Sequence, residues 1–220
     1  FVATKGFELL ALDYSQIELR VAAFLSGDKN LIEIFKEGRD IHTEVAARVF
    51  KVKPEDVDKE MRRRAKVINF GIIYGMGVNA LQQNLGSNRA EAQEFLNEYL
   101  ATFSGLAKYL EETKEFAALH GYTETFFGRR RSFEGIRSSI PFVKAAAERM
   151  AINAPIQGTE ADLIKLAMIK VDEYLKKKGL AEDAHVLLQV HDELVYEVKK
   201  DSLKEIAGAI KEIMESLLPL

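Results

Sequence analysis

Apolar residues recur with a helical period over most of this chain, and this pattern predicts its secondary structure. The expected helices cover approximately residues 15–26, 28–38, 40–50, 62–75, 89–102, 106–119, 142–153, 159–178 and 202–217. Asp28 and Asp40 stand where a side-chain oxygen can cap the helix that follows. Pro155 is expected to separate two helices, because proline lacks the N–H that a helix interior uses.

Shorter apolar runs predict strands. Residues 8–13 have the pattern of a buried strand that ends in an acid, and residues 122–127 that of a strand turning at Gly128. Residues 185–190 and 194–198 predict a hairpin with acids at its tip. The expected fold class is therefore α+β, with helices packed around a small antiparallel sheet.

Composition narrows the class of protein. The 220 residues are 47% hydrophobic and 30% charged, which is typical of a globular chain long enough to bury a sizeable core. No apolar stretch approaches the ~20 residues of a membrane span, so no membrane partner is expected. The absence of cysteine excludes disulfides and thiolate ligands, and a metal ion would have to bind carboxylates or histidine.

The net charge of −3 conceals two basic segments. Residues 59–66 hold five cations and one acid, and the arginines at 129–131 are followed by Arg137, Lys144 and Arg149. Local charge governs association with polyanions more than the total does. The sequence is therefore compatible with a partner that carries phosphates.

The first basic segment opens a row of side chains spaced four residues apart, which a helix places on one face: Arg62, Lys66, Phe70 and Tyr74. Two cations and two aromatic rings in one row can hold a polyphosphate at one end and stack on a base at the other. The same pattern is also compatible with a solvated helix that enters the core. Cations near a helix start interact unfavourably with the helix macrodipole unless an anion is bound there. The basic residues therefore favour a face that binds a polyphosphate. Asn69, Gly71 and Gly75 are poor residues for a core helix, which indicates that something approaches the backbone closely.

Two acids end predicted strands. Asp13 follows the strand at 8–13, and Asp192 lies at the tip of the hairpin. If the three strands share a sheet, both carboxylates emerge at the same edge. Mg²⁺ prefers a few carboxylates together with substrate phosphates, and two such ions support in-line phosphoryl displacement. Combined with the basic row, the acids indicate nucleotidyl transfer or hydrolysis.

Three segments resemble, in order, the motifs of the family A (DNA polymerase I-like) DNA polymerases. Residues 13–20 (DYSQIELR) resemble motif A, residues 62–75 resemble motif B, and residues 190–193 (VHDE) resemble motif C. The connecting stretches 37–43 and 155–159 match as well. The resemblance covers nearly the whole chain, which is far more specific than any single motif.

The resemblance implies a catalytic site. Asp13 and Asp192 would bind two Mg²⁺ ions, which Mn²⁺ could replace, with the Tyr14 carbonyl as a further ligand and Glu193 as a secondary catalytic acid. The incoming deoxynucleotide would contact Gln16, Ile17, Glu18, His42, Arg62, Lys66, Phe70 and Tyr74. Among these, Glu18 would reject a ribose 2′-OH. Primer–template DNA would contact Arg149, Asn153, Gln157 and His191, largely in the minor groove.

The resemblance also implies an organisation. Residues 1–27 and 130–220 would form a palm, whose small sheet carries the acids, and residues 28–129 mostly helical fingers. The thumb and any exonuclease domain would be absent from this chain. The expected protein is a monomer in the cytoplasm of a bacterial or phage-infected cell, although an organelle is also compatible. Arg64 stands where the family often has a small residue, and its charge is expected to face template phosphate or solvent.

Three other functions remain open. A single-subunit RNA polymerase shares the acids and a similar basic helix, but Glu18 argues against it because that site must admit the 2′-OH. A two-metal nuclease would have no triphosphate for the basic row to hold. A non-catalytic nucleic-acid-binding fragment of a polymerase is the third.

Overall fold

The computed structural model describes residues 1–218, which divide into two compact units. The first unit is built from Phe1–Ile17 and the chain from Thr159 onward, and the second from Glu18–Gly158. Each unit combines helices with a small antiparallel sheet, so the expected α+β class is confirmed. No helix within residues 1–218 has the length and apolar character needed to cross a membrane.

The first unit contains a three-stranded antiparallel sheet in the order β1-β5-β4. Its strands are β1 (Phe7–Asp13), β4 (Ala184–Val190) and β5 (Glu193–Lys199). The tight turn that joins β4 to β5 makes them a hairpin, and β1 adds to the other side of β5 from far away in the sequence. The predicted strands are therefore confirmed, and they share one sheet.

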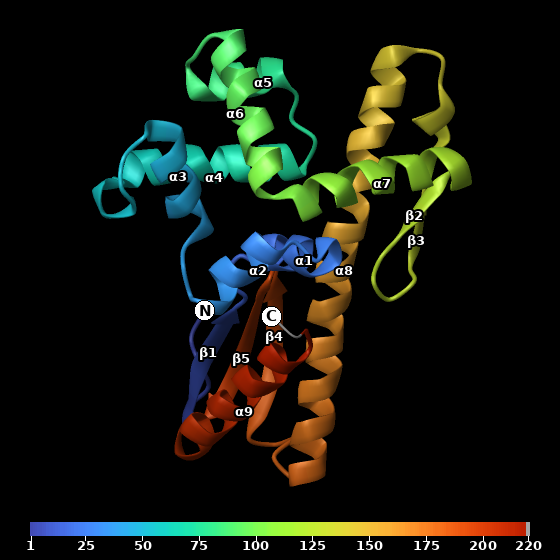
Figure 1. Ribbon diagram of the computed structural model, residues 1–220. Helices are drawn as coiled ribbons and strands as arrows, with labels where there is room; N and C mark the ends of the chain where they lie inside the picture. The colour runs from blue at the N-terminus through green and yellow to red at the C-terminus, as the bar shows by residue number, and fades with distance from the viewer. Residues whose placement is uncertain (219–220) are drawn as a thin grey trace. The chain divides into compact units, whose positions relative to one another are not determined.

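Helix α9 (Leu203–Ser216) covers this sheet (Figure 1). Its buried residues Ile206, Ile210 and Met214 recur every four positions, which gives the helix one apolar face. Alternate residues of β5 are buried, as expected for a strand with one face toward a core. The short 3-10 turn η3 (Lys200–Ser202) connects β5 to α9.

Strand β1 is less buried than its apolar sequence predicts. Leu9 is 39% exposed, and every residue of the strand is either exposed or half-buried. The reason is its position at an edge of the sheet, where in residues 1–218 only β5 pairs with it. The expectation of a buried strand was wrong in this respect, although its bounds were close.

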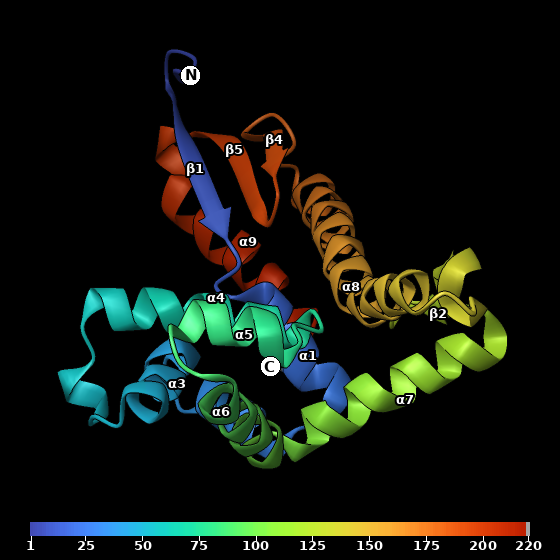
Figure 2. The ribbon, with the colours of Figure 1, turned by 90° about the horizontal axis from the view of Figure 1, so that it is seen from above.

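The second unit is mainly helical. Its helices and 3-10 turns are α1 (Ile17–Ser26, whose first residue belongs to the first unit), α2 (Lys29–Lys36), α3 (Ile41–Phe50), η1 (Pro54–Asp56), α4 (Lys59–Ile73), α5 (Val78–Leu85), α6 (Arg89–Thr102), α7 (Ser104–His120) and η2 (Glu134–Arg137). Helix α3 packs along α4, and α5 packs against both α4 and α6. Figure 2 views these helices from above. The short helix α5 was not predicted, because Leu81 is its only buried residue and two glycines precede it.

The segment expected as one strand at 122–127 is a hairpin instead. Strand β2 (Tyr122–Glu124) pairs with β3 (Arg130–Ser132), so part of the arginine cluster forms the second strand. Arg130 makes this possible by stacking on the Tyr122 ring, 4.6 Å from its centroid, and by pairing with Glu124 at 3.1 Å. Cross-strand contacts of this kind offset the weak strand preference of charged residues.

Helix α8 (Pro141–Lys178) continues through Pro155, so the expected separation into two helices was wrong. Proline removes one helical hydrogen bond and strains the preceding turn, but burial on both sides holds the helix together. Ala151, Ile152 and Ile156 are each no more than 1% exposed.

Asp28 joins the starts of two helices. One carboxylate oxygen accepts the Leu31 N–H at 3.0 Å and caps α2, as expected. The other oxygen accepts the N–H groups of Gly105 and Leu106, at 2.8 and 3.1 Å, in the first turn of α7. Asp28 is 3% exposed, and a Cβ on Gly105 would lie 2.8 Å from its Cα. One buried carboxylate therefore fixes α2 against α7.

We expect Asp28→Ala to lower the free energy of unfolding by ~2–4 kcal/mol, because three N–H groups at two helix starts lose their acceptor. Asp58→Ala is the matched control, since Asp58 caps only α4 and is exposed, and should cost ~1 kcal/mol. Urea unfolding measures both. Equal losses for the two variants would contradict a shared cap.

Candidate active site

The predicted acids meet at one end of the first unit's sheet. In the pairing of β1 with β5, Asp13 lies opposite Glu193, and in the hairpin Val190 lies opposite the same residue. The turn between β4 and β5 is His191–Asp192, with His191 in the left-handed region at φ 53°. Asp13, Asp192 and Glu193 therefore gather at this end of the sheet.

The three acids repel one another. Burial raises the pKa of Asp13, and the charges of Asp192 and Glu193 raise it further. Such crowding destabilises the ionised carboxylates and is relieved when a cation binds. Within residues 1–218, no three or more His, Asp or Glu side chains form a ready-made metal cage. Mg²⁺ needs only a few carboxylates besides substrate phosphates, so these residues fit such an ion.

Tyr14, the residue after β1, is held by one hydrogen bond from its backbone and one from its side chain. Its N–H donates to the Asp192 carbonyl at 3.3 Å, and its hydroxyl donates to the Met214 carbonyl of α9 at 3.0 Å. Burial raises the pKa of this hydroxyl well above its usual value. The residue expected to supply a backbone ligand is therefore fixed next to Asp13.

Gln16, Ile17 and Glu18 lie at the start of α1. Gln16 has a left-handed φ of 56° in the turn before the helix, and Ile17 is the first helical residue. The Ile17 side chain is 4% exposed, so a ligand would reach its backbone rather than its side chain. Glu18 lies in the first turn of α1, where an acid interacts favourably with the helix dipole.

The predicted row on α4 is present in the second unit. Lys66 Nζ lies 5.9 Å from the centroid of the Phe70 ring, and the Phe70 and Tyr74 ring centroids are 6.1 Å apart. Tyr74 is the C-cap of the helix. A charged end and an aromatic end thus follow each other along one face, as the spacing predicted.

The glycines of this segment allow close packing. A Cβ on Gly71 would overlap the Met76 side chain. Gly75 has a φ of 76°, and a Cβ there would lie 2.9 Å from Ile152 Cδ1 and 3.0 Å from Arg149 Cγ. The close approach predicted from these glycines therefore comes from the chain's own side chains.

The three consecutive arginines of α4 have three different partners. Arg63 pairs with Glu60 one turn earlier, at 2.6 Å, with both side chains mostly exposed. Arg64 donates to the carbonyls of Asn84 and Leu85 at the end of α5, and its guanidinium lies 5.1 Å from the Phe50 ring centroid. Arg64 is half-buried and satisfies the last carbonyls of α5, which are partners that the sequence did not indicate, and the expected contact with template phosphate stays a prediction.

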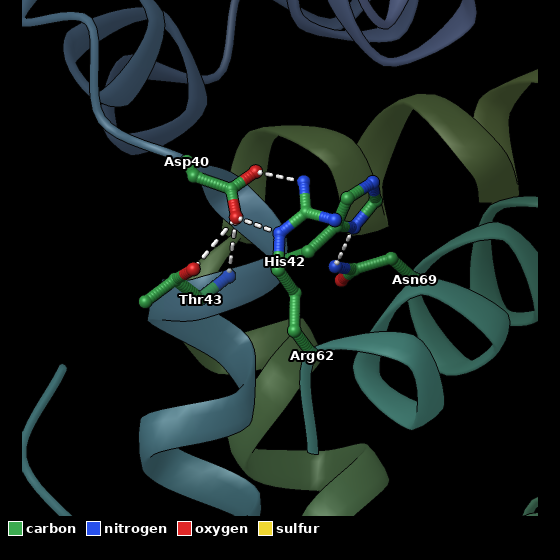
Figure 3. A network of polar contacts seen from close by, with 5 residues as sticks. All are labelled: Asp40, His42, Thr43, Arg62 and Asn69. Atoms are coloured by element: carbon green, nitrogen blue, oxygen red, sulfur yellow. Dashed lines mark hydrogen bonds and ion pairs between the residues drawn. The ribbon is translucent and has the colours of Figure 1, made fainter. Parts of the chain in front are cut away.

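Arg62 pairs with the residue that caps α3. Its Nε and Nη2 donate to the two carboxylate oxygens of Asp40, at 2.6 and 3.1 Å (Figure 3). Asp40 also accepts the N–H of Thr43 at 3.1 Å and its hydroxyl at 2.6 Å. Burial raises the pKa of Asp40, but the hydrogen bonds from Arg62 and Thr43 outweigh it and hold the pKa well below its usual range.

His42 and Asn69 form a buried pair beside this ion pair (Figure 3). The Asn69 amide nitrogen lies 3.0 Å from His42 Nδ1, and the two residues are 0% and 1% exposed, respectively. Burial lowers the pKa of His42 to about 4, and the nearby Arg62 and Lys66 lower it as well, although Asp40 opposes this. His42 is therefore a neutral imidazole near pH 7. If Asn69 donates to Nδ1, Nε2 carries the proton and is a hydrogen-bond donor.

The residues expected to contact DNA lie in both units. Arg149, Asn153 and Gln157 follow at four-residue intervals along α8 in the second unit, with Arg149 and Gln157 exposed. The side-chain oxygen of Asn153 is buried and has no hydrogen-bond partner within residues 1–218. His191 is exposed at the hairpin turn of the first unit.

Comparison with known proteins identifies the family. The sequence profile described as DNA polymerase family A matches residues 1–220. The chain belongs to DNA polymerase family A. It is 51% identical over 220 residues to the thermostable DNA polymerase I of Thermus filiformis and 47% identical over 220 residues to DNA polymerase I of Pseudomonas aeruginosa. It covers 26% and 24% of those proteins, so the chain spans about a quarter of their length.

A solved structure has the same fold. The polymerase domain of Pol1 from M. smegmatis, in complex with DNA primer-template and dNTP, matches the whole chain with a TM-score of 0.93 and 43% identity. The match covers 39% of that chain. The resemblance inferred from the three motifs is thus confirmed at the level of family and fold.

Asp192→Asn should stabilise this family A fold in the absence of metal by ~0.5–1 kcal/mol at pH 7, because it removes a charge that repels Asp13. A raised carboxyl pKa destabilises the ionised form, so the gain should shrink as the pH falls and Asp13 takes up a proton. Urea unfolding in EDTA at pH 7 and pH 4 measures it. Asp201→Asn, in η3 beyond the far end of β5, is the control. A loss of stability in Asp192→Asn would show that Asp192 has a structural role instead.

Lowering the pH from 7 to 5 should destabilise the wild type more than His42→Gln. The folded protein holds the pKa of His42 near 4, so the unfolded chain binds the proton first, starting at its ordinary pKa near 6.5. The stability linked to His42 is therefore lost between about pH 6.5 and 4. Thermal unfolding of both proteins across this window measures the effect, and parallel curves would contradict it.

Proposed function

We propose that this segment carries the catalytic centre and the nucleotide-binding face of a template-directed DNA polymerase. The reaction joins a deoxynucleotide to the 3′ end of a DNA primer. The observation that carries the proposal is the convergence of Asp13 and Asp192 at one end of the β1–β5 pairing, in a chain of DNA polymerase family A.

The acids would hold two Mg²⁺ ions, or Mn²⁺ in their place. Asp13, Asp192 and the Tyr14 carbonyl are the proposed ligands, and Glu193 is a secondary acid beside them. Burial and the neighbouring charges of Asp192 and Glu193 raise the pKa of Asp13, and this supports the assignment because a divalent cation stabilises carboxylates that are crowded and partly desolvated. When bound, the ions would activate the primer 3′ oxygen and stabilise the leaving phosphate oxygen.

The row on α4 would bind the incoming nucleotide. Arg62 and Lys66 provide charge for the triphosphate, and His42 can donate a hydrogen bond from Nε2 while it remains neutral. Phe70 would pack on the nucleotide, and Tyr74 would close the pocket near the templating base. The continuous contacts from Lys66 through Phe70 to Tyr74 support one binding face.

Sugar choice would be made at the start of α1. The carboxylate of Glu18 would reject a 2′-OH, with Gln16 and the Ile17 backbone beside it. Such rejection favours a DNA polymerase over the single-subunit RNA polymerase as the parent of this segment. In a nuclease, the cationic and aromatic row of α4 would have no triphosphate to bind.

Primer–template DNA is the proposed macromolecular partner. Arg149, Asn153, Gln157 and His191 would donate to minor-groove acceptors that all base pairs share, so that the fit of the pair is tested without reading its sequence. The similar polymerase domain from M. smegmatis forms a complex with primer-template and dNTP, which supports both partners.

Primer extension by the full-length protein that contains this segment tests the proposal. With Mg²⁺ and deoxynucleotides, the wild type should extend a primer, and Asp192→Asn should lower the rate by ~10³-fold or more, because it removes a charged metal ligand. Asp201→Asn is the matched control, since it makes the same change at an exposed acid in η3, beyond the other end of β5, and should leave the rate unchanged.

Each alternative has its own outcome. Extension by Asp192→Asn at the wild-type rate contradicts the assignment of the acids. Faster incorporation of ribonucleotides supports an RNA polymerase, and primer shortening without incorporation supports a nuclease. Binding of DNA without either reaction supports the non-catalytic function.

A further inference from the structure

Asp40 stands at the junction of two helices whose residues are far apart in the sequence. It is the N-cap of α3, and Arg62, on α4, is 22 positions further along the chain. Its carboxylate accepts hydrogen bonds from both Thr43 and Arg62 (Figure 3). The bonds from Thr43 hold the carboxylate on the first turn of α3, so its orientation toward Arg62 is fixed from its own helix.

The pairing with Asp40 also fixes the orientation of the Arg62 guanidinium. Asp40 binds the edge formed by Nε and Nη2, with both carboxylate oxygens engaged. A guanidinium has five N–H bonds arranged in a plane, so this pairing leaves the Nη1 edge for a second anion. The Arg62 side chain is 46% exposed, so solvent reaches part of it despite the pairing with Asp40.

We propose that Asp40 is a positioning residue for the nucleotide site, and that it holds the Arg62 guanidinium in the orientation that receives the triphosphate. This inference rests on the proposed function, because it takes Arg62 as a triphosphate ligand. Arginine side chains have many rotamers, and ordering them opposes binding. A partner that orders Arg62 before the nucleotide arrives removes part of that cost.

The charge of Asp40 also opposes binding of an anion, but less strongly. Asp40 lies on the edge of the guanidinium away from the proposed phosphate, so Arg62 stands between the two anions. The pair is partly exposed, and water screens the longer-range repulsion more than the direct contact. Positioning is therefore expected to outweigh repulsion, and loss of Asp40 should weaken nucleotide binding.

The neighbouring pair of Arg63 and Glu60 provides a contrast. It joins two residues of the same helix one turn apart, and its side chains are 67% and 60% exposed. Such pairs contribute little to a fold and fix no second helix. Glu60→Gln is therefore the matched control, because it removes a carboxylate from an adjacent arginine of α4 without touching Arg62.

Asp40→Asn separates the two roles of Asp40, since asparagine caps a helix about as well as aspartate but carries no charge. Single-nucleotide incorporation by the full-length protein, at saturating primer–template and with Mg²⁺, gives KM and kcat. We expect Asp40→Asn to raise the KM for the deoxynucleotide ~5–10-fold with kcat within ~2-fold of the wild type, and to lower the thermal unfolding temperature only slightly, because the lost ion pair is partly exposed. Glu60→Gln should change none of the three.

The outcomes separate this inference from the proposed function. An unchanged or lower KM in Asp40→Asn overturns the positioning role while the wild type still incorporates nucleotides. Absence of incorporation by the wild type overturns the proposed function and this inference with it. If Asp40→Asn unfolds at a much lower temperature, Asp40→Ser provides a second cap without a carboxylate. A fall in stability with an equal fall in kcat in both variants would show that Asp40 is only structural.

Discussion

The pairing of β1 with β5 is the constraint on which the acidic site depends. It brings the start of the described chain against a strand near its end, and its register sets Asp13 opposite Glu193. Side chains alternate across a sheet, so a shift of one residue would turn Asp13 to the opposite face. The Tyr14 hydroxyl, bonded to α9, and the Tyr14 N–H, bonded to the turn, both oppose such a shift.

This pairing holds together groups that repel each other. Burial raises the pKa of Asp13 first of all, and the charges of Asp192 and Glu193, which the sheet holds nearby, raise it further. Apolar burial under α9 supplies the compensating stability, through residues such as Ile206 and Ile210. The hydrophobic packing along the face of the sheet thus offsets the repulsion between the acids at its end. Such repulsion is common at sites that bind a charged ligand.

Much of this architecture could be predicted from the sequence, because local signals agreed with the fold. Asp28 and Asp40 were expected as caps and are caps, and the four-residue spacing on α4 predicted the row that the structure contains. The predictions from local sequence were wrong where tertiary contacts determine the secondary structure. Burial carries α8 through Pro155, and stacking on Tyr122 brings an arginine into β3.

The chemistry of individual side chains was less predictable than their positions. The family resemblance indicated His42 as a triphosphate contact, but its neutral state depends on burial and on the nearby cations Arg62 and Lys66, which the sequence did not reveal. Likewise, Arg64 is a charge without an evident partner in the sequence, and its partner is the end of a helix that the pattern did not predict. Partners that are distant in sequence leave no periodic signal. Roles that depend on them emerge only from the folded chain.

The shared carboxylate of Asp28 has a consequence for motion. Because one side chain accepts N–H groups from α2 and α7 at once, neither helix start can open without weakening the other. Hydrogen exchange at Leu31 and Leu106 would then follow a single opening event, although the two residues are far apart along the chain. Two segments that look independent in the sequence behave in this way as one cooperative folding unit.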